Sequence, residues 1–154
     1  EKDALNIEAL AATPDGHLLI GFRNPIPGGQ AMVVPLENPQ EVVAGRRARF
    51  GAPMFLDLGG LGVRSMISVE GGYLLVAGEY DSGGIARLYQ WDGRTGLKVL
   101  MPKLPGNPEG IALAGGHLFV MNDDGGRKIF GEDCKKLDNP NLQSFRTYDL
   151  PLPF

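Results

Sequence analysis

Three charged residues, Glu8, Arg64 and Glu109, occupy corresponding places in the sequence, each near the start of the first strand of a repeated segment. If these strands lie side by side, the three side chains converge at one end of the molecule. Two carboxylates and an arginine could then hold a divalent cation together with a phosphate or carboxylate group. The repetition also fits a structural role, in which each charge binds loop backbone of the neighbouring repeat. Glu8, Arg64 and Glu109 form the candidate ligand-binding set.

A second candidate is the acidic turn Asn122-Asp123-Asp124-Gly125. Oxygen-rich turns of this kind can hold Ca²⁺, so Asp123 and Asp124 are candidate metal ligands. The turn lacks the alternating ligand spacing of a calcium loop, and Asp and Asn also favour turns for local reasons. Calcium is therefore the one cofactor to consider, and the sequence indicates no other.

The elements that must position these residues are short strands separated by turns. The chain of 154 residues contains 23 glycines and 12 prolines, about twice the usual share of turn-forming residues, while 43% of its residues are hydrophobic. Apolar runs of six to eight residues alternate with turns such as Pro14-Asp15-Gly16 and Gly71-Gly72. No segment of ten or more residues has a helical period free of Gly and Pro. The pattern predicts an all-β fold.

These strands repeat. His17-Leu18-Leu19-Ile20 aligns with Tyr73-Leu74-Leu75-Val76 and with His117-Leu118-Phe119-Val120, and a turn glycine precedes each copy. The repeats span about 5–58, 59–104 and 105–154 of a single unit, 1–154. A third strand follows in each copy. A fourth strand is expected at Glu41–Ala44 or Phe55–Leu58 in the first repeat and at Leu97–Met101 in the second, whereas the third repeat stops after its third strand.

A spacing of about 40–50 residues per four-stranded unit is typical of β-propeller blades. A propeller has about 4–8 blades, and this sequence supplies about three. We therefore expect a partial propeller, the carboxy-terminal half of a larger ring. The ring would be closed by the remaining propeller half or by a second copy or chain. A compact sandwich of three sheets is the alternative.

Several stretches carry a resemblance to a known family. They are Leu5–Leu10, Gly21–Pro25, Leu58–Ser65, Tyr73–Gly78, Arg87–Gly93 and Asn107–Ile111. Together they resemble the carboxy-terminal half of the DUF3616 proteins, a family of uncharacterised bacterial propellers. The resemblance implies a propeller fold and amino-terminal blades outside this sequence, but no catalytic residues. More loosely, the chain is similar to phytase-like esterase and SdiA-regulated propellers, some of which bind calcium or hydrolyse phosphate esters.

Charge and hydropathy exclude several classes of protein. The 15 basic and 18 acidic residues are mixed along the chain, which argues against nucleic-acid binding. No apolar run is long enough to cross a membrane, so a soluble protein is expected. Two functions stay open. One is a scaffold that binds a small-molecule ligand or a protein. The other is a metal-assisted phosphoesterase, in which Glu8 and Glu109 hold the metal and Arg64 holds the phosphate.

Overall fold

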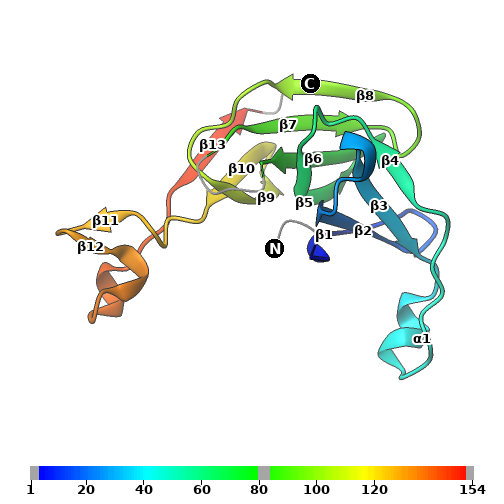
Figure 1. Ribbon diagram of the computed structural model, residues 1–154, viewed down its shortest axis with the longest axis horizontal. Coiled ribbons are helices and arrows are strands. Elements are labelled where there is room, and N and C mark those ends of the chain that lie inside the picture. Colours follow the sequence, from blue (N-terminus) through cyan, green and yellow to red (C-terminus); the bar gives the residue numbers. More distant parts are fainter. Residues whose placement is uncertain (1–3, 80–83, 152–154) are drawn as a thin grey trace.

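The protein is built from antiparallel β-sheets that follow one another along the chain. The computed structural model describes residues 4–79 and 84–151 (Figure 1). The first sheet comprises β1 (Asn6–Ala12), β2 (Leu18–Asn24), β3 (Ala31–Leu36) and β4 (Met54–Leu56). The second comprises β5 (Gly62–Val69), β6 (Gly72–Gly78), β7 (Ala86–Trp91) and β8 (Leu97–Met101). The third comprises β9 (Pro108–Ala114), β10 (His117–Asn122) and β13 (Thr147–Pro151).

Each sheet is a meander, because every strand pairs with the next strand of its sheet along the chain. The all-β prediction is therefore confirmed, and the architecture is consistent with part of a propeller. The expected fourth strands are β4 in the first sheet and β8 in the second. The alternative strand at Glu41–Ala44 is wrong, because this segment overlaps the helix α1 (Pro39–Val43). Proline at the first helical position and Glu41 in the first turn both favour a helix start.

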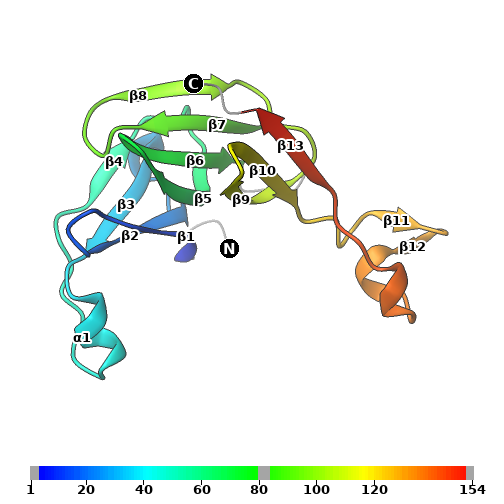
Figure 2. The same ribbon diagram turned by 180° about the vertical axis from the view of Figure 1, so that it is seen from behind.

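Two parts of the chain project from the sheets (Figures 1 and 2). One is the segment around α1, between β3 and β4. The other, which we call the lobe, covers residues 125–146 between β10 and β13. It contains β11 (Lys128–Ile129), β12 (Glu132–Asp133), η2 (Cys134–Lys136) and η3 (Pro140–Leu142); a further short helix, η1 (Pro27–Gly29), precedes β3. No helix in the described part of the chain has the length and apolar character needed to cross a bilayer.

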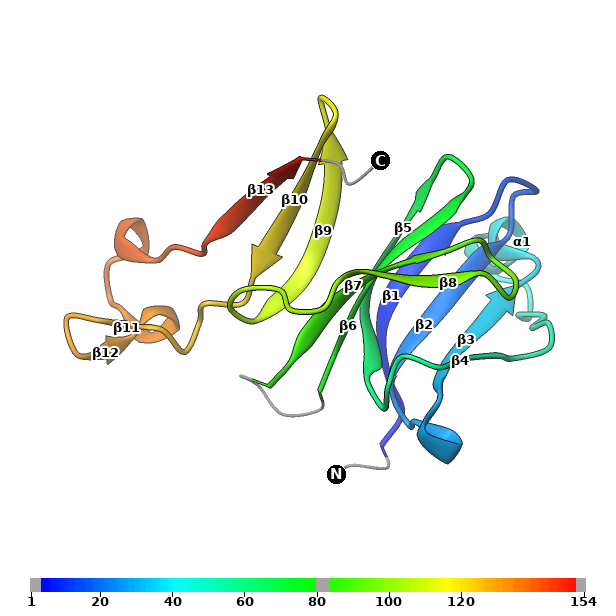
Figure 3. The same ribbon diagram turned by 90° about the horizontal axis from the view of Figure 1, so that it is seen from above.

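The three sheets stack on one another through their first strands. β1 packs against β5, and β5 packs against β9, so the second sheet lies between the other two (Figure 3). A core between the first and second sheets contains Ala9, Val33, Met66, Leu75 and Trp91, among others. A second core, between the second and third sheets, contains Leu74, Val76, Leu88, Ile111 and Val120, among others. The second sheet therefore gives one face to the first sheet and the other face to the third.

A one-residue β-bulge marks the same point in all three first strands. The register with the second strand shifts between Ile7 and Ala9, between Val63 and Ser65, and between Pro108 and Gly110. The extra residues are Glu8, Arg64 and Glu109, so the three charged residues occupy equivalent positions in the structure. A bulge re-aims the side chain that it carries, and bulges are common next to functional sites.

Counting from these bulges also corrects the repeat alignment by one residue. The second strands pair so that Gly72, not Tyr73, is level with His17 and His117. Tyr73 is level with Leu18 and Leu118, and it is buried against Trp91 with the two ring centroids 5.4 Å apart. The sequence comparison matched aromatic rings, whereas the structure matches the inward-facing apolar side chains.

Candidate functional site

Arg64 connects the second sheet to the third. Its side chain is only 2% exposed. Its Nη1 donates hydrogen bonds to Oε1 of Glu109 and to Oδ1 of Asn107, both at 2.6 Å. Its Nη2 donates to the backbone carbonyl of Glu79 at 2.8 Å. The guanidinium is therefore held by groups of both sheets.

Arg23 makes the corresponding connection between the first and second sheets. Its Nη1 donates to Oε1 of Glu8 at 2.9 Å, and its Nη2 donates to the carbonyl of Glu79 at 3.3 Å. The same Glu8 oxygen accepts a 2.9 Å hydrogen bond from Nδ2 of Asn6. Both arginines thus meet at the carbonyl of Glu79, at the end of β6. We call Glu8, Arg23, Arg64, Asn107 and Glu109 the inner-strand network.

Two glycines make room for this arrangement. A Cβ atom at Gly62, the first residue of β5, would collide with the backbone of Arg23. A Cβ atom at Gly78, the last residue of β6, would collide with the guanidinium of Arg64. Because neither glycine carries a side chain, β5 can approach the end of β2 and Arg64 can lie across β6. The close approach of the backbones is what brings the two arginines to one carbonyl.

Burial dominates the electrostatics of Glu109. Desolvation raises the pKa of this carboxyl above its usual range, although the positive charge of Arg64 opposes the rise. The negative charges of Glu8 and Asp123 raise it further. Burial also lowers the pKa of Arg64, although a guanidinium stays protonated in proteins. Glu109 is thus a carboxylate whose charge is incompletely compensated.

The network offers carboxylate oxygens to a further group. Oε2 of Glu8 is buried and accepts no hydrogen bond from the described residues. The side chain of Glu109 is 31% exposed, and it forms an ion pair with Arg64 through Oε1. Four carboxylates contribute negative charge here, against the two arginines. The charges of Glu8, Glu79 and Glu109 act on the pKa of Arg64, and those of Glu8 and Asp123 act on the pKa of Glu109. This end of the first strands is therefore suited to a positively charged or N–H-donating group.

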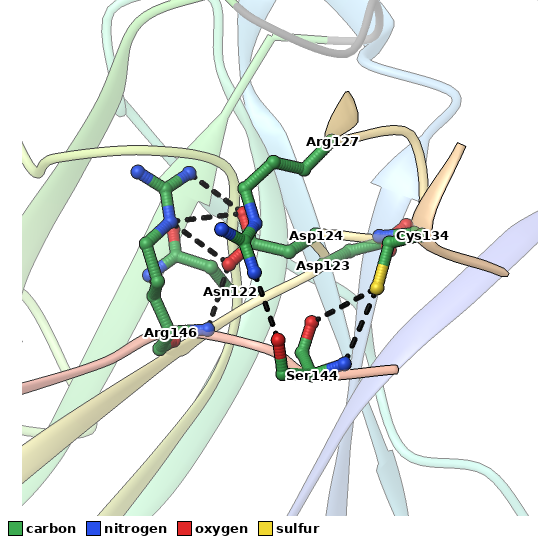
Figure 4. Close-up of polar contacts among 8 residues, drawn as sticks. Asn122, Asp123, Asp124, Arg127, Cys134, Ser144 and Arg146 are labelled. Atoms are coloured by element: carbon green, nitrogen blue, oxygen red, sulfur yellow. Dashed lines mark hydrogen bonds and ion pairs between the residues drawn. The ribbon is translucent and has the colours of Figure 1, made fainter. Parts of the chain in front are cut away.

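The predicted metal ligands Asp123 and Asp124 both accept hydrogen bonds from protein groups (Figure 4). Oδ1 of Asp123 accepts a hydrogen bond from the backbone N–H of Gly125 at 2.8 Å. Asp124 is buried, and both of its carboxylate oxygens accept hydrogen bonds from Arg146 at 2.6–3.2 Å. Within residues 4–79 and 84–151, no three His, Cys, Asp or Glu side chains gather as a metal-binding group. The aspartates fasten the lobe to the third sheet.

Further contacts hold the lobe together. Arg127 donates to Oγ of Ser144 at 2.8 Å, and the buried thiol of Cys134 lies 3.2 Å from the backbone nitrogen of Ser144 (Figure 4). Hydrogen bonds from Lys128 and Lys136 lower the pKa of Asp133 to about 2. A hollow of about 590 Å³ lies against the lobe, and its lining includes Asn107, Asp123, Arg127, Lys135 and Arg146.

The structure thus brings Glu8, Arg64 and Glu109 together, but these three residues do not all contact one another directly. Arg64 contacts Glu109 directly, while Glu8 joins them through Arg23 and the carbonyl of Glu79. Sequence reasoning missed Arg23 and Asn107 as members of the site. Arg23 lies near the end of β2, which pairs with the strand that carries Glu8, and Asn107 directly precedes β9, the strand that carries Glu109. That signal becomes visible only when the strand pairing is known.

Comparisons with known proteins place the first two sheets in a family. A family model described as a protein of unknown function (DUF3616) matches residues 1–102. The matched range contains Glu8, Arg23 and Arg64, while Asn107, Glu109 and the lobe lie beyond it. No curated protein and no solved structure matches the chain.

Proposed function

We propose, from the premise that the chain belongs to the DUF3616 family of proteins of unknown function, that it is a binding scaffold rather than an enzyme. The inner-strand network would receive a positively charged group of a small ligand or a protein partner. The observation that carries this proposal is the buried Oε2 of Glu8, which accepts no hydrogen bond from the described residues. A buried carboxylate oxygen without a donor is costly, and a cationic ligand would satisfy it.

The stacking of the sheets supports a place in a β-propeller. In a propeller the first strand of each blade lies nearest the central channel, where ligands bind. The three bulged residues project from β1, β5 and β9 at equivalent positions. A closed ring would direct all three toward this channel. The inner-strand network would then be its polar wall.

A metal-assisted phosphoesterase requires more rearrangement. In that mechanism Arg64 holds the phosphate, but its guanidinium is buried and already donates to Glu109, Asn107 and the carbonyl of Glu79. Releasing it would leave a buried charge uncompensated, at a cost of about 3–5 kcal/mol. The scaffold function needs no such change, and we prefer it for this reason.

Binding of lysine amide, a small dication, tests the proposal. We expect saturable binding by titration calorimetry, weakened about tenfold in Glu8→Gln, which corresponds to the loss of one charged contact. The matched control is Glu41→Gln, because Glu41 is an exposed glutamate that pairs with Arg49 far from the network. Absence of binding, or equal weakening by both variants, would contradict the proposal. CaCl₂ in place of lysine amide shows whether the site prefers a metal ion.

A phosphoester assay separates the scaffold from the enzyme. With p-nitrophenyl phosphate we expect no turnover, with or without Ca²⁺. Glu109→Gln should then act on stability and its pH dependence alone, because the amide keeps an acceptor for Arg64 but removes the carboxyl whose pKa burial raises. Turnover that Glu109→Gln abolishes at an unchanged melting temperature would replace the scaffold by the phosphoesterase.

A further inference from the structure

The hollow against the lobe carries more positive than negative charge. Three cationic side chains and two carboxylates line it, namely Arg127, Lys135, Arg146, Asp123 and Asp124. Its volume of about 590 Å³ is within the usual range of small-ligand sites, roughly 300–1,000 Å³. The chain as a whole is acidic, with 18 acidic against 15 basic residues. The positive charge of this concave surface is therefore a local feature.

The two carboxylates of the hollow already have donors within the protein. Asp124 is buried and accepts from the backbone N–H, Nε and Nη2 of Arg146. Oδ1 of Asp123 accepts from the backbone N–H of Gly125 at 2.8 Å. The positive charge of Arg127 also acts on Asp124 and lowers its pKa. One buried carboxylate is thus shared by two arginines, and its single charge can neutralise only one of them.

Both arginines keep donors that the protein does not use. Nη2 of Arg127 donates to Oγ of Ser144 at 2.8 Å, which fixes the direction of the guanidinium (Figure 4). Nε of Arg127 is buried and has no hydrogen-bond acceptor among the described residues. Arg146 uses Nε and Nη2 for Asp124, which leaves Nη1 without an acceptor in the described part of the chain. Incompletely hydrogen-bonded guanidinium groups at the wall of a hollow favour a ligand that brings acceptor oxygens.

Lys135 and Gly126 complete this part of the lining. The backbone N–H of Lys135 donates to the carbonyl of Gly125 at 3.0 Å, which holds Lys135 beside the acidic turn. Its exposed ammonium forms no ion pair within residues 4–79 and 84–151, whereas that of Lys136 pairs with Asp133 at 3.0 Å. A Cβ atom at Gly126 would meet no atom within 4 Å, so the hollow is open at this point.

We propose that the hollow binds the phosphate group of a small phosphate monoester. Such a group has three acceptor oxygens and about 1.5–2 negative charges at pH 7, so it can accept from Arg127, Lys135 and Arg146 together. A carboxylate has only two oxygens, and Asp124 already supplies one to these arginines. The volume of the hollow leaves room for the rest of the ligand. This anion site is additional to the proposed function, because the inner-strand network is suited to a cation.

Titration calorimetry with glycerol 1-phosphate tests the site at low ionic strength, where saturable binding of one ligand per chain is expected. Gly126→Asp should weaken binding at least about tenfold, because it adds a carboxylate to the lining and repels the ligand. Gly126→Asn is the matched control, since it has the same shape without the charge, and it should bind within about threefold of the unchanged chain. Both side chains fit, because Gly126 has open space and no left-handed φ.

Two further variants change charges that the hollow already has. Lys135→Met keeps most of the stem and should weaken binding about fivefold, whereas Lys103→Met, at an exposed lysine outside the lining, should leave it unchanged. Asp123→Asn should strengthen binding about threefold, because it keeps an acceptor for Gly125 but removes a negative charge. Its control is Asp138→Asn, an exposed change in the lobe outside the lining.

Acetate and inorganic phosphate define the ligand class. Acetate should bind at least about tenfold more weakly than glycerol 1-phosphate, because it has one charge and two oxygens. Equal binding of acetate would overturn the assignment to phosphate, and binding of inorganic phosphate but not of glycerol 1-phosphate would overturn the assignment to a monoester. Absence of saturable binding, or equal effects of Gly126→Asp and Gly126→Asn, would overturn the site itself.

Discussion

The two arginine–carboxylate pairs of this protein are reversed with respect to burial. In the inner-strand network the cation is buried and the anion is partly exposed, with Arg64 at 2% and Glu109 at 31%. At the base of the lobe the anion is buried and the cation is exposed, with Asp124 at 3% and Arg146 at 49%. Both pairs have their closest nitrogen–oxygen distance at 2.6 Å. Distance alone therefore does not distinguish them.

The two arginine–carboxylate pairs differ in the number of hydrogen bonds that the carboxylate accepts. Glu109 accepts a hydrogen bond from one nitrogen of Arg64, and burial raises the pKa of Glu109. Asp124 accepts from the backbone N–H, Nε and Nη2 of Arg146, and these hydrogen bonds lower its pKa. Protein donors replace the lost water at Asp124 but only partly at Glu109. Asp124 is thus fully hydrogen-bonded by Arg146, whereas Glu109 can accept a hydrogen bond from a further partner.

Removing the buried cation should have the largest effect. Arg64→Met keeps the aliphatic stem but leaves Glu109, Asn107 and the carbonyl of Glu79 without their shared donor. We expect a loss of about 3–5 kcal/mol in the free energy of unfolding, measured by urea denaturation. Arg46→Met is the control, because Arg46 is exposed in the loop after α1 and should change stability by less than about 0.5 kcal/mol. A loss below about 1 kcal/mol would show that the network does not hold the sheets together.

Neutralising the buried anion should have a smaller and more local effect. Asp124→Asn retains an acceptor but loses the charge-assisted hydrogen bonds of Arg146, which is worth about 1–3 kcal/mol. Amide hydrogen exchange should accelerate in the lobe and not in the first two sheets, since Asp124 and Arg146 lie at its base. Asp138→Asn, an exposed change within the lobe, is the control. Uniform acceleration over all sheets would remove the distinction between the two regions.

The smallest effect is the pH dependence, which should have opposite signs in the two regions. The raised pKa of Glu109 means that the folded state holds its proton more tightly, so stability falls as pH rises from about 4.5 through the folded value. Glu109→Gln should remove this slope, which cannot exceed about 1.4 kcal/mol per pH unit. Asp124, with its lowered pKa, contributes stability above about pH 4 and loses it as pH falls further. Denaturation between pH 3 and 8 measures both slopes, and equal signs would contradict this account.

Strand positions were largely predictable from the sequence, because alternation and turn chemistry are local. The turns at Gly71 and Gly115 end one strand and start the next as expected, and the third sheet has the predicted three strands among the described residues. The misplaced fourth strand at Glu41–Ala44 shows the limit. Three apolar residues in a four-residue segment do not distinguish strand from helix, and Pro39 at the start of the helix favours the helix.

The candidate site was predictable only in part. Repetition identified Glu8, Arg64 and Glu109 as equivalent, and the bulges place them so. Repetition could not show that Arg23 would link Glu8 to the carbonyl of Glu79. It also matched the wrong residues in the second strands, since it could not see which side chains face inward.

The sequence by itself determined the elements and the charges. Its turn residues, strand periods and three repeats dictate stacked meanders, because each of these depends on residues within a few positions of one another. Only the tertiary structure decided which charges meet and which are buried. Arg64 reaches Glu109 across 45 positions because Gly78 leaves room for its side chain to lie across β6.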